Sequence, residues 1–310
     1  MKNLHLAFIL SFFMIISGYD ILAAQHYNGF DLSRLTINRS EVFHGGPPRD
    51  GIPSIDNPRF LPANNVNYLK DDDIVIGLVR GKVARAYPTR ILVWHEIVND
   101  TIEGEHVAVT YCPLCGTAMV FSRKIGGQIA TFGVSGLLYR SDVLMYDRES
   151  ESLWSQLAMK AVSGPNVGKQ LRWLPSHHLT WKAWKKKHPT TEVLSTETGY
   201  SRNYGGQAYA SYFASGNTMF PVPHERKELP NKEWVLGVIL DGKAKAYPVS
   251  QLPSQKEVQD TIGNTSVTVL YDAERKHPQI KLADGSLAPT VMVFWFAWQA
   301  FYPETALWSP

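Results

Sequence analysis

The two cysteines of this 310-residue chain, Cys112 and Cys115, stand three positions apart in the stretch TYCPLCGTAMVF. Two thiolates at this spacing can bind one ion, with zinc–sulfur bonds of about 2.3 Å, and Pro113 and Gly116 suit the tight turn that this requires. The stretches VAVTY and TAMVF on either side predict two strands. The sequence therefore predicts a metal site at the tip of a β-hairpin.

A complete structural zinc site has four protein ligands, and the chain has no second cysteine pair. We expect His95 as the third ligand, with Glu96, Asp100, His106 and Met119 as lesser options. Two thiolates and one imidazole leave a fourth position on zinc open for water or substrate, whereas a further ligand from Met119 would favour copper. Glu96 is expected to act as a general base beside a metal-bound water.

Two other uses of Cys112 and Cys115 stay open. In a thiol-disulfide oxidoreductase or redox sensor, Cys112 would attack and Cys115 would resolve, but the GTAMVF stretch predicts no helix that would favour a thiolate. An inert disulfide would close a very short loop and contribute little stability. A non-enzymatic binding or envelope-assembly module is the remaining hypothesis.

The stretch YDRESESLW suggests a second part of the site. We expect Asp147 and Arg148 to line a cleft beside the cysteines and to act on a small polar molecule, because polar groups in a cleft suit such ligands. The alternative is a structural ion pair at Arg148. His177 and His178 are expected on a solvated loop.

The chain resembles itself over a long distance. Residues 74–92 resemble 234–252, and the match continues without a gap from 96–111 to 256–271, always 160 positions on. The stretch WKAWKKKHPTTEVL then resembles WFAWQAFYPETALW at a spacing of 114, so the first copy contains 46 more residues. Such self-similarity indicates a duplicated structural unit.

The second copy lacks the chemistry of the first. Gln255, Lys256 and Asp272 replace His95, Glu96 and Cys112. Function is therefore expected in the first copy.

These patterns predict an α+β fold rich in antiparallel strands, with two repeated units packed as a pseudo-symmetric pair. The predicted organisation is a signal peptide (1–24), a Gly/Pro-rich N-terminal arm (25–70), repeat unit 1 with the cysteines and an insertion (71–200), a connector (201–230) and a degenerate repeat unit 2 (231–310). We refer to the two repeats below as unit 1 and unit 2.

The N-terminal residues and the net charge restrict where the protein is located and which partners it binds. An apolar run after Lys2 and small residues before Gln25 are typical of a cleaved secretory signal, so we expect an exported protein, periplasmic or extracellular, with no membrane span after cleavage. The net charge of +3 leaves no basic excess for a nucleic acid. Oligomeric state is left open.

The motifs WHEIVND, VTYCPLCGTAMVF, FGVSGLLYRSDVLMYDRESESLWSQ and GGPPRDGIPSID resemble a bacterial and archaeal family known as domain of unknown function 3179. The resemblance runs from about residue 43 to the C-terminus. It implies a homology group without implying a reaction. The stretch LAMKAV departs from the family, in which a glycine often follows SLWSQ.

Overall fold

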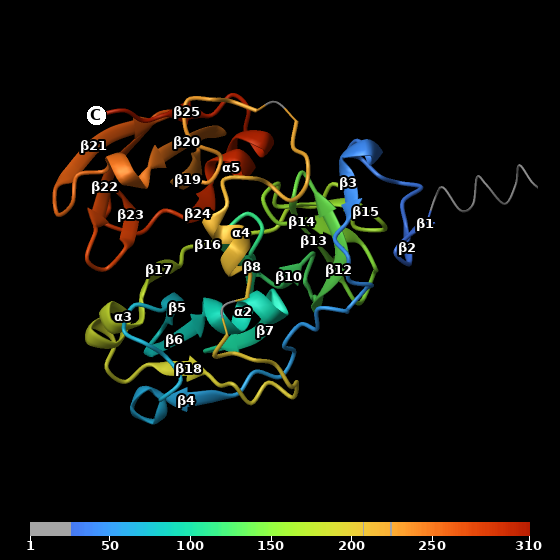
Figure 1. The fold of residues 1–310 in the computed structure, drawn as a ribbon, viewed down its shortest axis with the longest axis horizontal. Helices are drawn as coiled ribbons and strands as arrows, with labels where there is room; N and C mark the ends of the chain where they lie inside the picture. Colours follow the sequence, from blue (N-terminus) through green and yellow to red (C-terminus); the bar gives the residue numbers. More distant parts are fainter. Residues whose placement is uncertain (1–25, 207, 224) are drawn as a thin grey trace, which may run out of the picture.

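The computed structural model describes residues 26–310 except 207 and 224. The predicted signal peptide lies outside the described residues. No helix in the described part of the chain is long and apolar enough to cross a membrane. Short helices and antiparallel sheets dominate the chain, which confirms the predicted α+β class (Figure 1).

Unit 1 begins with the predicted hairpin, whose strands meet at a Gly81-Lys82 turn. A five-stranded sheet, in the order β17-β5-β6-β18-β4, and a four-stranded sheet, in the order β16-β9-β8-β7, form its framework. The strands of the first sheet are β4 (Phe60–Pro62), β5 (Ile74–Arg80), β6 (Val83–Pro88), β17 (His177–Thr180) and β18 (Glu192–Leu194). Those of the second are β7 (Ile97–Ile102), β8 (Glu105–Cys112), β9 (Thr117–Ser122) and β16 (Trp173–Leu174). The helices are α2 (Thr89–His95) and α3 (Trp181–Lys187).

Unit 2 repeats this plan with two smaller sheets, in the orders β24-β19-β20-β25 and β21-β22-β23. The first contains β19 (Trp234–Leu240), β20 (Lys243–Pro248), β24 (Thr290–Phe294) and β25 (Ala306–Leu307). The second contains β21 (Glu257–Ile262), β22 (Thr265–Asp272) and β23 (His277–Leu282). Its helices are the 3-10 helix η3 (Val249–Gln251) and α5 (Trp295–Phe301).

The same side-chain contacts recur in the two units. Trp184 of α3 lies against Gly77, where an added Cβ would be 2.3 Å from the indole ring, and Trp298 of α5 lies against Gly237 at 2.5 Å. Both helices end immediately before the residue that precedes a proline, as the sequence predicts. The elements thus correspond in order and in local packing, while the pseudo-symmetric pairing of whole units stays a prediction.

The extra residues of unit 1 supply four of the five strands of a further sheet, in the order β15-β14-β13-β12-β3, which we call the inserted sheet. It contains β3 (Val42–His44), β12 (Phe132–Tyr139), β13 (Asp142–Asp147), β14 (Leu153–Ser155) and β15 (Lys160–Ser163), and the small hairpin β10 (Lys124–Ile125) and β11 (Gln128–Ile129) precedes it. Nearly every residue of β12 and β13 is buried. The insertion is therefore part of the core.

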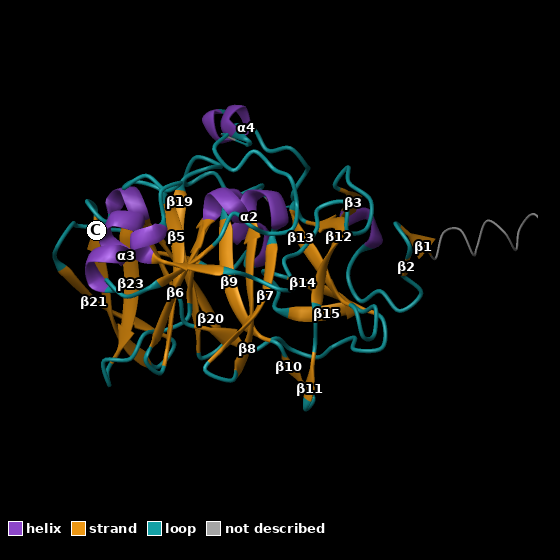
Figure 2. Cartoon of the chain, turned by 90° about the horizontal axis from the view of Figure 1, so that it is seen from below, coloured by secondary structure: helices purple, strands orange, loops and turns teal. Residues whose placement is uncertain are grey.

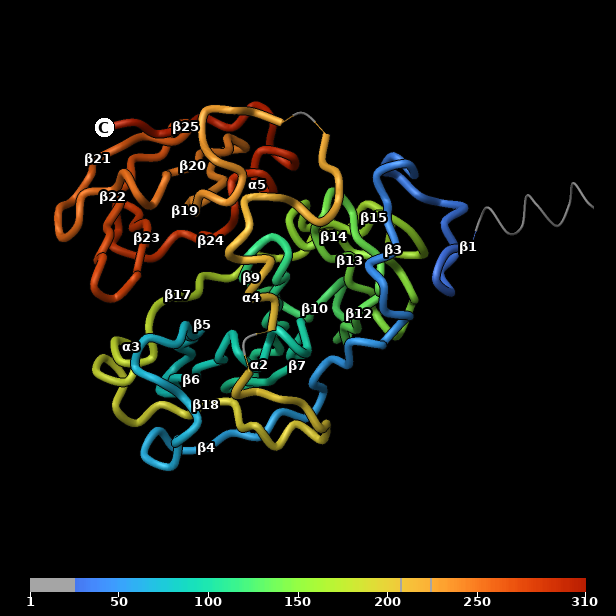
Figure 3. The backbone as a smooth tube through the Cα atoms, viewed as in Figure 1, coloured from blue at the N-terminus to red at the C-terminus, as the bar shows by residue number. Residues whose placement is uncertain are grey.

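The N-terminal arm is mostly irregular but contributes strands to two sheets, β3 to the inserted sheet and β4 to unit 1. Its other elements are β1 (His26–Tyr27), β2 (Phe30–Asp31) and the 3-10 helices η1 (Arg39–Glu41) and η2 (Ala63–Asn65). The connector contains α4 (Ala210–Ala214) and crosses the face of the molecule between the two units (Figure 3). Figure 2 shows α2 and α3 beside the strands, with α4 outermost.

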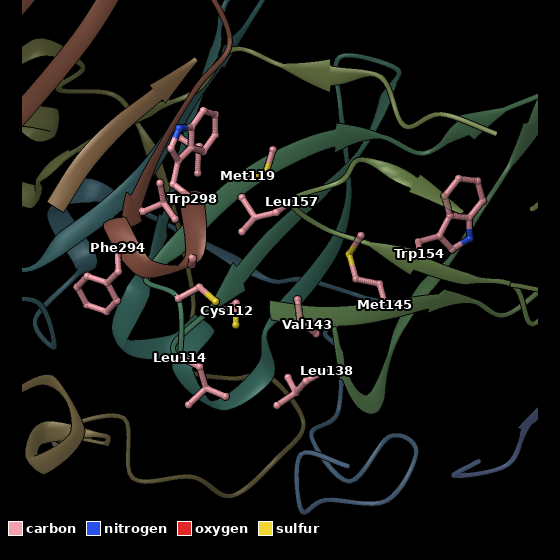
Figure 4. Close-up of a cluster of buried hydrophobic side chains, with 14 of the residues drawn as sticks. Cys112, Leu114, Met119, Leu138, Val143, Met145, Trp154, Leu157, Phe294 and Trp298 are labelled. Atoms are coloured by element: carbon pink, nitrogen blue, oxygen red, sulfur yellow. The ribbon is translucent and has the colours of Figure 1, made fainter. Parts of the chain in front are cut away.

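One large buried cluster joins three parts of the chain (Figure 4). It combines Cys112 and Leu114 of the cysteine hairpin, Leu157 after β14, and Phe294 and Trp298 of unit 2. The cysteines therefore lie where the inserted sheet and unit 2 meet the unit 1 hairpin.

The expectation of a solvated loop at His177 and His178 was wrong. Both residues belong to β17 and pair with Gly77 and Ile76 of β5. Burial lowers the pKa of His177 to about 3 and that of His178 to about 4. Two adjacent histidines suggested an exposed loop, but the segment is a strand whose imidazoles pack against unit 2.

A candidate metal centre at the junction of two hairpins

Cys112 and Cys115 lie at the tip of the β8–β9 hairpin, as predicted, with Cys112 opposite Thr117 in the ladder. Gly116 has a φ of +66°, and a Cβ on it would lie 2.5 Å from the ring of Trp234. Glycine is therefore required at this turn for both its backbone conformation and its lack of a side chain. The backbone N–H of Phe294 donates to the Cys115 carbonyl at 2.9 Å, so unit 2 holds the tip in place.

A second hairpin brings a carboxylate to the two thiols. Strands β12 and β13 join through a two-residue turn, Arg140 and Ser141, whose φ angles are +51° and +69°. Turns of this shape favour Asn and Gly, so other residues there store backbone strain. Arg140 is held by an ion pair with Glu41 and by a 2.6 Å hydrogen bond to the Ala300 carbonyl. Asp142 follows directly and is fully buried.

The three side chains form a compact group. Among the described residues, Cys112, Cys115 and Asp142 are the group of potential ligands whose donor atoms come close together, all within 4.8 Å of one another. Both thiols also face the carbonyl oxygen of Ser141, at 3.9 Å from Cys112 Sγ and 3.2 Å from Cys115 Sγ. These three side chains could hold a metal ion.

The acidic groups around the two thiols have raised pKa values. Burial raises the pKa of Asp142 to about 7 and raises the pKa of the Cys112 and Cys115 thiols. Burial and then the negative charge of Asp142 raise the pKa of Glu96 to about 8. In the described part of the chain, no lysine, arginine or histidine forms an ion pair with these acids. Four acidic groups thus share a buried region without a compensating positive charge.

A chain of hydrogen bonds supports Asp142. The Leu157 N–H donates to Asp142 Oδ2 at 2.9 Å, and Thr117 Oγ1 lies 3.4 Å from Oδ1. Thr117 donates to Gln156 Oε1 at 2.6 Å, and Gln156 Nε2 donates to Thr110 Oγ1 at 2.7 Å. All of these side chains are buried. The network fixes the position of the carboxylate relative to the thiols.

His95, the expected third ligand, is not part of this group. It is fully buried, but Nδ1 lies 2.7 Å from the Pro53 carbonyl and Nε2 lies 2.6 Å from the Tyr204 hydroxyl. Both ring nitrogens are therefore occupied elsewhere. The next residue, Glu96, adopts a φ of +58° at the end of α2 and is only 8% exposed. The structure thus places Glu96, and not His95, in the electrostatic neighbourhood of the cysteines.

Asp147 and Arg148 do not lie beside the cysteines. Asp147 is the last residue of β13 and Arg148 follows it, about 16 Å from Asp142 at the usual rise of a strand. Asp147 accepts hydrogen bonds from the Trp154 indole at 2.7 Å and from the Ser150 N–H at 2.7 Å, as a turn-stabilising residue does. Arg148 pairs with Asp50 at 2.9 Å. These contacts stabilise the local structure and do not involve the cysteines.

The connector covers the hairpin tip. The Tyr212 hydroxyl of α4 donates to the Leu114 carbonyl at 2.7 Å. Burial raises the pKa of Tyr209 to about 12, and the charges of Glu96 and Cys112 add to this effect. The site is therefore shielded from bulk water on this side, which strengthens electrostatic interactions within it.

Asp142 was not predicted as a ligand. It does carry a sequence signal, because it directly precedes the apolar stretch VLMY in the segment that unit 2 lacks. A lone carboxylate within a buried strand needs a partner.

A family described as "Protein of unknown function (DUF3179)" matches residues 49–305 of the chain. No curated protein and no solved structure matches it. The match agrees with the resemblance seen in the motifs.

Proposed function

This chain belongs to the DUF3179 family, and we propose that it is a metal-binding protein whose ion is held by Cys112, Cys115 and Asp142. The observation that carries the proposal is the approach of two thiols and one carboxylate, from two separate hairpins, to within 4.8 Å of one another. Donor atoms around a tetrahedral zinc ion lie about 3.3–3.8 Å apart for bonds of about 2.0–2.3 Å. Small rotations of these side chains would reach that geometry.

Zinc is the ion that this donor set favours. Two thiolates and a carboxylate are familiar zinc ligands, whereas copper(I) prefers soft ligands throughout. Met119, the soft ligand that would have favoured copper, lies apart from Cys112 in Figure 4. Three protein ligands leave one position for water or a small molecule, as in catalytic zinc sites. When bound, the ion would supply Lewis acidity at that position.

Glu96 is the acid–base group that we assign to this centre. It is nearly buried, and its pKa is raised to about 8 because burial disfavours the charged form. In the described part of the chain its carboxylate has no hydrogen-bond partner. A carboxyl group of this kind can exchange a proton near neutral pH. The assignment retains the predicted role of Glu96 while replacing His95 by Asp142 in the ligand set.

The redox alternative is less well supported by the same residues. Redox-active cysteines have lowered pKa values, often at the N-terminus of a helix. Here burial raises the pKa of both thiols, and they lie at the tip of a β-hairpin. A nucleophilic thiolate is therefore disfavoured in the absence of a cation.

The test is elemental analysis of protein purified without added metal or chelator, under reducing conditions. We expect one zinc per chain, lost in Cys112→Ser and in Cys115→Ser and retained in Glu96→Gln, which removes the acid–base group but no ligand. Metal-free protein with fully titratable thiols would refute the proposal. If the metal-free thiols were also oxidised reversibly to a disulfide, the redox alternative would replace it.

A further inference from the structure

A cavity of about 380 Å³ lies at the boundary between unit 1 and unit 2, and neither cysteine lines it. It is lined by Ile74 and His178 of unit 1 and by Trp234, Tyr271, Lys276 and Met292 of unit 2. Small-molecule sites usually measure about 300–1,000 Å³ and are apolar with a few polar groups. The volume and composition of this cavity match that description.

The apolar walls are held in fixed positions. The Trp234 ring packs on Phe294 with ring centres 4.3 Å apart, and it also lies against the backbone of Gly116. Tyr271 is half-buried on β22. Two aromatic side chains in a rigid wall favour a planar ring as the bound group, because stacked or edge contacts between rings are worth about 0.5–1.5 kcal/mol beyond burial.

His178 provides a polar group without a partner. Its Nδ1 atom is buried and forms no hydrogen bond among the described residues. Leaving such a group unsatisfied costs about 1–3 kcal/mol. The corresponding residue of unit 2, in the strand that pairs with β19, is Met292. The strand itself therefore does not require an imidazole at this position, and burial keeps the ring neutral by lowering its pKa to about 4.

Lys276 provides a positive charge at the same cavity. It lies in the turn between β22 and β23 with a φ of +49°, and no carboxylate pairs with it in the described part of the chain. A left-handed conformation is unusual for a lysine, and it fixes where the side chain begins. An anionic group on a ligand would find an unpaired cation here.

We propose that this cavity binds a small aromatic carboxylate that carries a hydroxyl group. The ring contacts Trp234 and Met292, the carboxylate pairs with Lys276, and the hydroxyl forms a hydrogen bond with the His178 imidazole. The site uses none of the three metal ligands, so it stands or falls independently of the metal proposal.

The test is isothermal titration calorimetry with three probes: 4-hydroxyphenylacetate, phenylacetate without the hydroxyl, and p-cresol without the carboxylate. We expect 4-hydroxyphenylacetate to bind with a dissociation constant below about 1 mM and at least about tenfold more tightly than either analogue. His178→Met, which introduces the unit 2 residue, should remove the advantage over phenylacetate. Lys276→Gln should remove the advantage over p-cresol.

Lys256→Gln, a change of an exposed lysine that does not line the cavity, is the matched control and should bind as the unchanged protein does. Circular dichroism establishes that each variant is folded, and His178→Gln replaces His178→Met if the latter is not. Absence of binding for all three probes would overturn the proposal, as would binding that neither substitution alters.

Discussion

Asp142 and Asp147 stand at the two ends of β13 and offer a matched pair of substitutions. Asp142→Asn removes a negatively charged ligand, so we expect zinc affinity to fall by at least about 100-fold, beyond the usual 10–100-fold effect of a residue that only supports a ligand. Asp147→Asn should keep stoichiometric zinc but lower stability by about 1–3 kcal/mol, because the amide cannot accept every hydrogen bond of the carboxylate. Competition with a chromogenic chelator measures the first effect and urea unfolding the second. Equal zinc affinity in both variants would contradict the ligand assignment.

Thr117 supports Asp142 through the buried hydrogen-bond chain that includes Gln156. Thr117→Val leaves Gln156 Oε1 without its donor and removes the polar neighbour of Asp142. We expect zinc affinity to fall by about 10–100-fold. Thr110 is the next residue in this series of hydrogen bonds. Thr110→Val breaks its buried 2.7 Å hydrogen bond with Gln156 and serves as the control. The same chelator titration should show a much smaller change for Thr110→Val, and an equal loss in both variants would indicate general destabilisation instead.

At the residue scale, the sequence predicted the cysteine pair and its hairpin but not the carboxylate of Asp142 that lies beside them. The hairpin was predictable because its strand pattern and its glycine are local features. Asp142 was not found because a different hairpin brings it to the site, through a strained Arg140-Ser141 turn that favours neither residue. His95 was expected because the second copy loses it together with Cys112, but the Pro53 carbonyl and Tyr204 hydroxyl that contact its ring are distant in sequence.

At the scale of elements, each unit contains a glycine whose missing side chain leaves room for a tryptophan ring. A Cβ at Gly77 would lie 2.3 Å from the Trp184 ring, and one at Gly237 would lie 2.5 Å from the Trp298 ring. Gly77→Ala and Gly237→Ala should each lower stability by about 1–3 kcal/mol or more, because the helix or the sheet must shift. Gly216→Ala, where a Cβ would meet no atom within 4 Å, is the control and should leave the melting temperature nearly unchanged. Thermal unfolding followed by circular dichroism tests all three, and unchanged melting of Gly77→Ala would contradict the close contact.

The repeated elements were predictable from internal similarity, since the strand and helix patterns recur with their glycines, tryptophans and prolines. The inserted sheet was not, because it has no counterpart in unit 2 against which to compare it. Its position explains the difference in chemistry between the units. The insertion brings Asp142 to the hairpin that contains the cysteines, whereas the equivalent hairpin of unit 2 has an ion pair between Asp272 and Arg275.

At the scale of the whole molecule, unit 1 and unit 2 meet at two histidines, the half-buried His177 and the buried His277. His177 Nδ1 lies 3.1 Å from His277 Nε2, and the Thr180 N–H donates to the Arg275 carbonyl at 3.0 Å across the same boundary. Burial lowers the pKa of His177 to about 3, with a further decrease from His277, Lys187 and His188. Burial also lowers the pKa of His277 to about 4, and Lys187 and Arg275 outweigh the opposing effect of Asp272. Protonation of either imidazole therefore opposes contact between the units.

This arrangement predicts that acid weakens the boundary between the units before it unfolds each unit. The unfolded pKa of histidine is about 6.5, so the neutral imidazoles contribute their full stability above that pH. As pH falls from about 6.5 towards 4, the unfolded chain takes up protons that the folded chain resists, and stability decreases. His277→Gln removes one titrating group and, with it, a positive charge that would otherwise develop beside His177. Its melting temperature should therefore fall less than that of the unchanged protein over this interval. Lys281→Gln, a change in the same strand that removes no imidazole, should follow the unchanged protein. Parallel melting curves for His277→Gln and the unchanged protein from pH 7 to pH 4 would show that the histidine pair does not govern the response to acid.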